Sequence, residues 1–506
     1  MSSTIIATQS LPVLAPEAPE RRRCWECLRR RLVCDAVKPV CNKCRVAGIV
    51  CPGYDDKKPL TWLAPGKVTC RTRRKSRVSE NDSKAKSNTS KSKENQGKTI
   101  RKEKEIRKVS ELIFHSALRT DVCDVYEAVQ YYNAVFYPYT KSGHSDNKNV
   151  YIDQIPLGIV KYLPTAIAHN LVAVVFQHRM CVQTQWKLDC PSAKHAEARL
   201  HHHRGISIRA LNEDIANERT QSSDAVLTGV ILLLQSEITA CISPNWRHHV
   251  AGILAMLACR GGPTVWMQNA PFLNGVLLSF FITIITANTT SPSLDQVELC
   301  PPDELMALVK ELYPMGLHPY MPCPTPLFLE MVRINNLRVE IARGLVDKET
   351  ARHDAEDIIM RIEAFHPDDA VPFYEKKEHN DFISFMFQSA MAIYCISSLQ
   401  GLGGLPRTHR LAAIKAAHSD HLFFLLSETR KDEVLKKSVG WPLMVAGFEA
   451  GARVDKRQFL RELIVEQSKD IGTPLPLYAI KALRKFWDGE STDWDVCFDQ
   501  PYAFMC

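Results

Sequence analysis

Six cysteines within residues 24–51 constrain this chain more than any other feature of its sequence. They follow the spacing C-x2-C-x6-C-x6-C-x2-C-x6-C, in a stretch where 17 cysteines over 506 residues would place about one by chance. The first three repeat the spacing of the last three, and no histidine lies within the stretch, so a metal bound here has sulfur ligands alone. The six are Cys24, Cys27, Cys34, Cys41, Cys44 and Cys51.

The number of cysteines determines the kind of metal site. A structural zinc ion takes four thiolates in a tetrahedron at roughly 2.3 Å. Six cysteines are too many for one ion and two short of two separate ions, and two bridging thiolates close that gap. Each C-x2-C pair fits the first turn of a short helix, where residues three apart lie on one face. Pro39 lies in the connector between the units, where a fixed φ suits a tight reversal.

The stretch resembles the binuclear zinc-cluster DNA-binding domain of fungal transcription factors. The likeness covers the six ligand positions, the basic run between the second and third cysteines, Asp35 after the third cysteine, and the proline loop. The resemblance implies two zinc ions per chain, with Cys24 and Cys41 as the bridging pair. It also implies double-stranded DNA as a partner and the nucleus as the location.

Other interpretations of the cysteines fit less well. A disulfide knot needs an oxidising compartment, and residues 1–20 have no basic region followed by an apolar one, as a secretion signal would. RING, LIM and classical finger sites use histidine or different spacings. The possibility that the zinc cluster binds protein or RNA instead of DNA stays open.

The basic run at residues 28–33 contains the expected DNA reader. Arginine suits this role because its planar guanidinium can donate two hydrogen bonds to guanine O6 and N7 in the major groove. In the family, the residues that match Arg30 and Arg31 approach the bases of a CGG-type triplet, so we expect base contacts from these two. Phosphate contacts are expected from Arg29, Arg45, Arg21, Arg22 and Arg23.

The basic run departs from the family pattern at both ends. A basic residue usually follows the second cysteine and another precedes the third, whereas this chain has Leu28 and Val33 there. The usual phosphate contacts and the identity of the triplet therefore stay open. The second unit carries only Lys43 and Arg45, so we expect it to act mainly as scaffold.

Charge is divided unevenly along the chain. Residues 1–110 hold 27 Lys and Arg against 11 Asp and Glu, whereas the remainder holds 37 against 45. A basic N-terminal segment attracts a phosphate backbone. We expect a disordered tail over 1–20, the zinc-cluster domain over 21–54, a disordered basic linker over 55–110 and an all-α regulatory domain over 111–506.

The linker contains a dense basic cluster, formed by Arg71, Arg73, Arg74, Lys75 and Arg77. Such a cluster is typical of a nuclear-import signal and equally of a phosphate-contacting arm, and a plain solvated linker is the third possibility. The apolar residues at 100–113 do not sustain the a/d repeat of a zipper. We therefore expect a monomer, or a dimer formed through the helical domain.

Long amphipathic segments replace the linker from about residue 111 onward, and strand alternation is scarce. The segment at 246–260 ends at two glycines, a helix C-cap pattern, and Ser223 or Asp224 caps the preceding segment. Helices are predicted over 121–137, 159–181, 193–216, 223–240 and 246–260. Their order, with the late GWPLMVAGFEAG segment, resembles the helical regulatory domain often called the fungal-specific transcription factor domain, over about 120–500.

Three local features of the helical part have two interpretations each. His201, His202 and His203 point about 100° apart on a helix, which favours a polar face over a metal site. The apolar run at 276–287 is shorter than the roughly 20 residues of a membrane span and favours a buried core helix. The acidic and aromatic tail at 486–506 suits an activation segment or a packed last helix.

The sequence predicts a small binuclear zinc-cluster module plus a large all-α domain, joined by a disordered basic linker. We expect a zinc-dependent, sequence-specific regulator of RNA polymerase II transcription that reads CGG-like triplets in the major groove. Expected partners are DNA and transcription machinery or coregulators, with no membrane. No HExxH, GxSxG or phosphate loop is present, so no enzyme is predicted. The alternative function is a small-molecule sensor in the helical domain, with DNA binding as its output.

Overall fold

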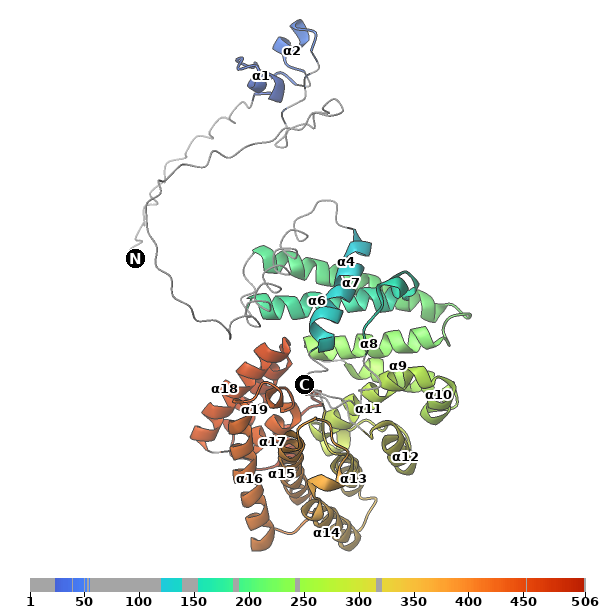
Figure 1. Cartoon of the computed structure of the whole chain (residues 1–506), viewed down its shortest axis with the longest axis vertical. Coiled ribbons are helices and arrows are strands. Elements are labelled where there is room, and N and C mark those ends of the chain that lie inside the picture. Colours follow the sequence, from blue (N-terminus) through green and yellow to red (C-terminus); the bar gives the residue numbers. More distant parts are fainter. Residues whose placement is uncertain are drawn as a thin grey trace, which may run out of the picture. The chain divides into compact units, whose positions relative to one another are not determined.

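The chain forms two units, Met1–Ile100 and Arg101–Cys506 (Figure 1). The computed structural model describes residues 23–38, 40–49, 51, 54, 120–138, 153–184, 191–241, 246–314, 321–451 and 453–504. Several predicted features lie outside the described residues: the tail at 1–20, Arg21, Arg22, Pro39, and the linker at 55–110 with Arg71, Arg73, Arg74, Lys75 and Arg77.

The first unit contains two one-turn helices, α1 (Trp25–Arg29) and α2 (Asn42–Val46). Each begins after the first cysteine of a repeat, whose side chain caps the helix. The Cys24 Sγ accepts a hydrogen bond from the Cys27 N–H at 3.4 Å, and the Cys41 Sγ accepts one from the Cys44 N–H at 3.3 Å. The C-x2-C pairs therefore lie on the first turns of short helices, as predicted.

The second unit is built from helices, with no β-strand among the described residues. Its first half contains α4 (Asp121–Tyr131), the π-helical turn η1 (Tyr132–Phe136), η2 (Leu157–Tyr162), α6 (Thr165–Thr184), α7 (Pro191–Ala216), α8 (Asp224–Ala240), α9 (Trp246–Ala258), α10 (Pro263–Asn269), η3 (Pro271–Leu273), α11 (Asn274–Thr289), η4 (Ser293–Asp295) and α12 (Pro302–Leu312). Its second half contains α13 (Thr325–Arg343), α14 (Lys348–Ala364), η5 (Pro367–Asp369), α15 (Lys377–Gly401), α16 (His409–Thr429), η6 (Leu435–Lys437), α17 (Gly440–Glu449), α18 (Val454–Ile471), α19 (Leu475–Trp487) and α20 (Trp494–Cys497).

The predicted helices are confirmed, together with the signals that end them. The hydroxyl of Ser223 accepts a hydrogen bond from the Val226 N–H at 3.3 Å and caps α8. Gly261 and Gly262 follow α9 with φ of 89° and 97°, a region that favours glycine because it has no Cβ. These local signals therefore placed the start of α8 and the end of α9, whereas the helix predicted over 159–181 is divided into η2 and α6, which begins at Thr165.

The helical unit has two apolar clusters. The larger runs through α8, α11, α13, α15, α17 and α19 and includes the fully buried Phe280, Met391 and Leu443. The smaller joins α4, η2, α6 and the start of α7 around Val129 and Val172. In Figure 1, α4, α6 and α7 lie at one end of the unit and α13 to α16 at the other.

In the part of the chain that the structure describes, two helical stretches are long and apolar enough to cross a membrane by length and composition alone: Pro271–Thr289, which includes α11, and α15. The bent pair of α9 and α10 would make a third span if it is counted as one. In the folded unit, 67% and 83% of the first two apolar windows are buried. The prediction of a buried core helix at 276–287 is confirmed. The length argument for it was wrong, because the continuous stretch from Pro271 has 19 residues; burial decides the matter.

The C-terminal tail is part of the core, which overturns the activation-segment interpretation. Trp494, Phe498 and Phe504 are each at most 2% exposed. The Trp494 indole N–H donates to the Thr289 carbonyl at 2.7 Å, and Thr290 exchanges two hydrogen bonds with the backbone of the tail. The aromatic side chains are therefore occupied by packing.

A buried arginine links this tail to the centre of the unit. The Arg338 side chain is completely buried and donates to the Ser291 carbonyl at 2.8 Å, the Tyr394 hydroxyl at 3.0 Å and the Asp495 carboxylate at 2.6 Å. Asp495 also accepts a hydrogen bond from the Ser293 N–H at 2.9 Å. A buried charge needs such pairing, because desolvation would otherwise expel it from the core.

The polar-face expectation for the three histidines holds for two of them. His201 and His202 have side chains 60% and 50% exposed, whereas His203 is completely buried. His203 Nε2 lies 2.8 Å from an Asp124 carboxylate oxygen, and its Nδ1 lies 2.8 Å from His169 Nδ1. The expectation was wrong for His203 because α7 packs against α4 and α6, which supply these partners.

Candidate metal centre and nucleic-acid interface

The two cysteine repeats fold into the same local structure. In the first repeat the Leu32 N–H donates to the Cys27 carbonyl at 2.9 Å, and in the second the Ile49 N–H donates to the Cys44 carbonyl at 3.0 Å. The chain leaves each short helix through a residue in the left-handed conformation. The sequence repeat is therefore a structural repeat, and each half returns its third cysteine to the same centre.

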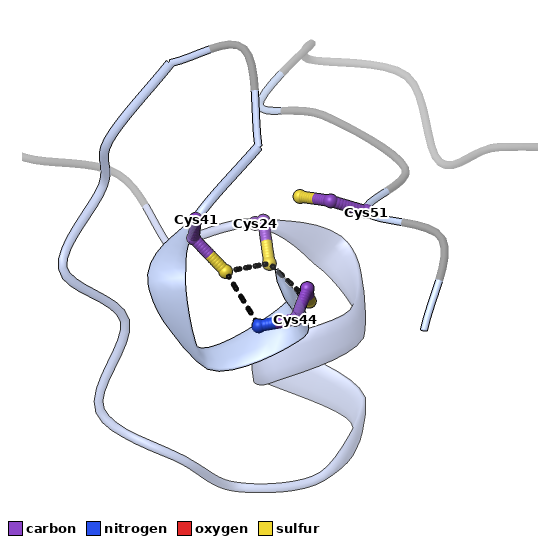
Figure 2. A group of neighbouring side chains, drawn as sticks. All are labelled: Cys24, Cys41, Cys44 and Cys51. Carbon is purple, nitrogen blue, oxygen red and sulfur yellow. Dashed lines mark hydrogen bonds between the residues drawn. The ribbon is translucent and has the colours of Figure 1, made fainter. Parts of the chain in front are cut away.

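The six sulfur atoms form two groups of four that share two members. One group consists of Cys24, Cys27, Cys34 and Cys41, and the other of Cys24, Cys41, Cys44 and Cys51. Within each group the Sγ atoms all lie within 4.8 Å of one another. Figure 2 shows the side chains of the second group, Cys24, Cys41, Cys44 and Cys51, close to one another.

The spacing of the sulfurs fits zinc. A tetrahedron with zinc–sulfur bonds of roughly 2.3 Å has edges of about 3.8 Å. The Cys24 and Cys41 Sγ atoms are 3.7 Å apart, and the Cys24–Cys44 and Cys27–Cys41 separations are 3.8 and 3.6 Å. Both tetrahedra can therefore form with little movement of the chain.

The folded module disfavours the charged form of several of these thiols, because they are buried. Burial raises the pKa of Cys24, Cys27 and Cys44 to about 12. Burial acts in the same direction on Cys34, but backbone N–H groups, chiefly that of Cys24, outweigh it and lower the Cys34 pKa to about 7. Zinc must displace protons from the thiols of Cys24, Cys27 and Cys44. As the thiolate ligands form, hydrogen bonds from the N–H groups at the helix starts stabilise them.

Two residues outside the cysteine set hold the loops around the cluster. The Asp35 carboxylate accepts hydrogen bonds from the Asn42 N–H at 3.0 and 3.2 Å. The Tyr54 hydroxyl donates to the Val37 carbonyl at 2.7 Å and lies 4.0 Å from the Cys34 sulfur. The contribution of Tyr54 was missed at the sequence level, and its position three residues after the last cysteine was the only signal available.

Comparison with known proteins identifies both units. The fungal Zn(2)-Cys(6) binuclear cluster domain matches residues 22–61, and the fungal specific transcription factor domain matches residues 120–503. The chain belongs to the fungal zinc-cluster transcription factor family. It is 30% identical over 98% of its length to the phomenoic acid biosynthesis cluster-specific transcriptional regulator of Leptosphaeria maculans, of which it covers 91%. No solved structure matches the chain significantly.

Membership of the zinc-cluster family gives the sulfur groups their metal. The six cysteines of this transcription factor bind two zinc ions, and the chain regulates transcription instead of catalysing a reaction. The family implies DNA binding and a nuclear location. The predicted fold class, a zinc-cluster module with a large helical domain, is confirmed.

The structure describes five of the arginines predicted to contact DNA, and all five are exposed: Arg23, Arg29, Arg30, Arg31 and Arg45. Arg29 forms an ion pair with Glu26 at 2.7 Å, and the Arg45 guanidinium donates to the Asn42 side chain at 2.7 Å. Within the described residues neither Arg30 nor Arg31 forms an ion pair. Among the described residues, no carboxylate therefore competes for these two guanidinium groups.

Arg31 has an unusual backbone conformation. Its φ is +56°, and the equivalent residue of the second repeat is Gly48, with φ +63°. Leu28 and Val33, at the ends of the basic run, are 51% and 77% exposed and offer no charge to phosphate. Basic side chains are therefore absent at these two family positions, and the basic residues between them are Arg29, Arg30 and Arg31.

A second group of possible metal ligands lies in the helical unit, formed by Asp121, Asp124 and His203. The guanidinium of Arg199 pairs with Asp124, so the cation at this position is an arginine side chain. We assign no metal to this group.

Proposed function

We propose that this transcription factor regulates RNA polymerase II genes by reading a CGG-like triplet in the major groove with Arg30 and Arg31. The single observation that carries the proposal is the left-handed backbone at Arg31, where the second repeat has glycine. A left-handed residue with a side chain costs about 1–2 kcal/mol. The first repeat carries this cost at Arg31, and its exposed turn thereby presents a guanidinium group that can pair with guanine.

The remaining contacts follow from position and charge. We propose Cys24 and Cys41 as the bridging ligands, because both belong to each four-sulfur group. Phosphate contacts are assigned to Arg23, Arg29 and Arg45, and to Arg21 and Arg22 outside the described residues. The linker cluster Arg71, Arg73, Arg74, Lys75 and Arg77 is proposed as the nuclear-import signal.

The decisive test compares two single substitutions on specific and nonspecific DNA. Arg31→Ala should lose about 1–3 kcal/mol on the selected site and change nonspecific binding weakly, because a base contact carries sequence information. Arg45→Ala is the matched control and should weaken binding to all sequences alike. An equal loss on both DNAs for Arg31→Ala would make that residue a phosphate contact and sink the proposal.

The relative suggests the kind of gene that is controlled. Its similarity along almost the whole chain supports regulation of a biosynthesis gene cluster by this factor as well. We further propose that the helical domain contacts transcription machinery or coregulators, and that the chain is a monomer or dimerises through this domain. Sedimentation of the zinc-loaded chain with and without DNA tests the oligomeric state.

A second candidate function is that the helical domain senses a small molecule, with DNA binding as its output. The observation that favours it is a cavity of about 420 Å³ inside the helical unit. Ligand pockets in proteins occupy about 300–1,000 Å³ and are mainly apolar. The test is the DNA affinity of the full chain with and without a bound occupant.

A further inference from the structure

The cavity lies between the two apolar clusters of the helical unit. One wall is a stripe of α6 that includes Ile167, Leu171 and Val174, spaced so that they share one helix face. The other walls come from η1 and the segment before α6, from α8, from Ser279 of α11, and from the end of α18 with the residues after it. Leu171 packs on the smaller cluster and Ile471 belongs to the larger one. An occupant would therefore touch both clusters at once.

Among the described residues that line the cavity there is no aspartate, glutamate, lysine or arginine. The one histidine among them is His178, and burial lowers its pKa to about 4, so it is neutral at pH 7. Its Nδ1 lies 2.9 Å from the Tyr131 hydroxyl. A charged occupant would find no counter-charge here, and burying its charge unpaired would be costly. The cavity therefore selects an uncharged molecule.

Three amide side chains, Asn170, Gln177 and Gln235, lie among the polar residues of the lining, beside hydroxyl groups such as those of Ser236 and Ser279. Asn170 is 96% buried and pairs with the Ser236 hydroxyl at 2.9 Å, and the Gln235 amide donates to the Ser279 hydroxyl at 2.7 Å. Gln177 makes no hydrogen bond to any described residue.

The pairing of Asn170 leaves one of its polar groups without a partner among the described residues. The Ser236 hydroxyl lies 2.9 Å from the Asn170 Oδ1 and 2.8 Å from the Leu233 carbonyl, and it has one proton to donate. If that proton goes to Asn170 Oδ1, no described residue accepts from the Asn170 NH2 group; if it goes to Leu233, Asn170 must turn its amide round to donate to Ser236, and no described residue then donates to the amide oxygen. A buried amide with an unpaired group costs free energy that a ligand can recover.

We propose that this cavity binds one uncharged, mainly hydrocarbon small molecule whose carbonyl or hydroxyl oxygens pair with Asn170, Gln177 and Gln235. The inference rests on the second candidate function only for its regulatory consequence. Binding itself requires nothing of the DNA-reading surface. The occupant stabilises the contact of α6 with α8 and α18, because it fills space that apolar side chains leave open.

The test uses the zinc-loaded full chain and Nile red, an uncharged dye with a ring carbonyl. The unsubstituted chain should bind it saturably at one site with a blue shift of its emission. Val174→Trp, which fills the cavity from α6, should weaken binding by about tenfold or more, where tenfold corresponds to about 1.4 kcal/mol. Thr473→Trp, on the segment after α18, changes another lining residue and should weaken binding by a similar factor. Val265→Trp, on α10 away from the cavity, is the matched control and should bind as the unsubstituted chain does.

The two possible failures are distinguishable. Non-saturable binding, or unchanged binding in either cavity-filling variant with folding verified by its thermal transition, overturns the site. Saturable binding that both variants remove, without any effect of the dye on DNA affinity, supports the site and overturns the sensor role. A change in DNA affinity that disappears in both variants supports the two together.

Discussion

In the zinc-cluster module the buried side chains are cysteines, such as Cys24 and Cys41, whereas the helical domain buries large aromatics such as Phe280 and Trp494. The module has two helices of five residues each, too short to be stable alone in water. Its structure therefore depends on ligand bonds to zinc, and that of the helical domain on apolar burial. This contrast explains why the metal site could be predicted from the sequence and the cavity could not. The spacing of the ligands is local, whereas a cavity depends on how helices that are distant in the sequence pack together.

Removal of zinc should have the largest effect of the changes considered, and it should unfold one unit but not the other. Zinc binding supplies about 10–16 kcal/mol of apparent folding free energy to small metal domains. Chelation under reducing conditions should therefore unfold the module and abolish DNA binding, while the thermal transition of the helical domain stays in place. Circular dichroism and DNA titration measure the two effects.

A single ligand substitution sharpens this result. Cys24→Ser should lower the zinc content of the purified chain, whereas the matched control Cys259→Ser, at an exposed cysteine of the helical domain, should keep two zinc ions. If chelation shifted the thermal transition of the helical domain, that domain would depend on the metal too, and the contrast between the two units would be wrong.

Loss of the buried arginine should have the opposite selectivity. Arg338→Ala removes the cation that pairs with Asp495 and the donor to the Ser291 and Asn288 carbonyl groups. Breaking a buried pair costs about 3–5 kcal/mol. The urea midpoint of the helical domain should fall accordingly, with zinc content unchanged. Arg430→Ala, which removes a surface ion pair with Glu466, is the control and should cost about 0–1 kcal/mol. Equal effects of the two substitutions would contradict the assigned role of Arg338.

Acid should weaken the helical domain through His178. Burial lowers the pKa of this histidine from 6.5 to about 4. The unfolded chain therefore takes up the proton first, so the stabilisation is complete above about pH 6.5 and is lost as pH falls toward 4. His178→Asn should reduce the fall in urea midpoint between pH 7 and pH 4.5, whereas His201→Asn, at an exposed histidine, should not. An unchanged profile in His178→Asn would exclude this origin of acid sensitivity.

The smallest expected effect concerns the strained turn of the module. At position 31, Gly should make the module more stable than Ala by about 1 kcal/mol, because the left-handed backbone penalises a Cβ. At position 30, where φ is −85°, the order should reverse. Competition with a chelator measures both pairs, and both substitutions at Arg31 should lose the selected DNA site. The same order at the two positions would remove the strain argument.

Much of the fold could be predicted because its signals are local. The six cysteines, the Ser223 cap and the glycines after α9 each act within a few residues of their own position. The burial of Arg338 and His203 could not be predicted, because their partners Asp495 and Asp124 are 157 and 79 residues away in the chain. The tail at 486–506 looked ambiguous for the same reason.

The direct test of the central claim is a selection of bound fragments from random double-stranded DNA by the zinc-loaded full chain, repeated after chelation. We expect enrichment of a CGG-like triplet that disappears when zinc is removed and when Arg31 is replaced by alanine. The absence of an enriched motif, or a motif that survives chelation, would contradict it.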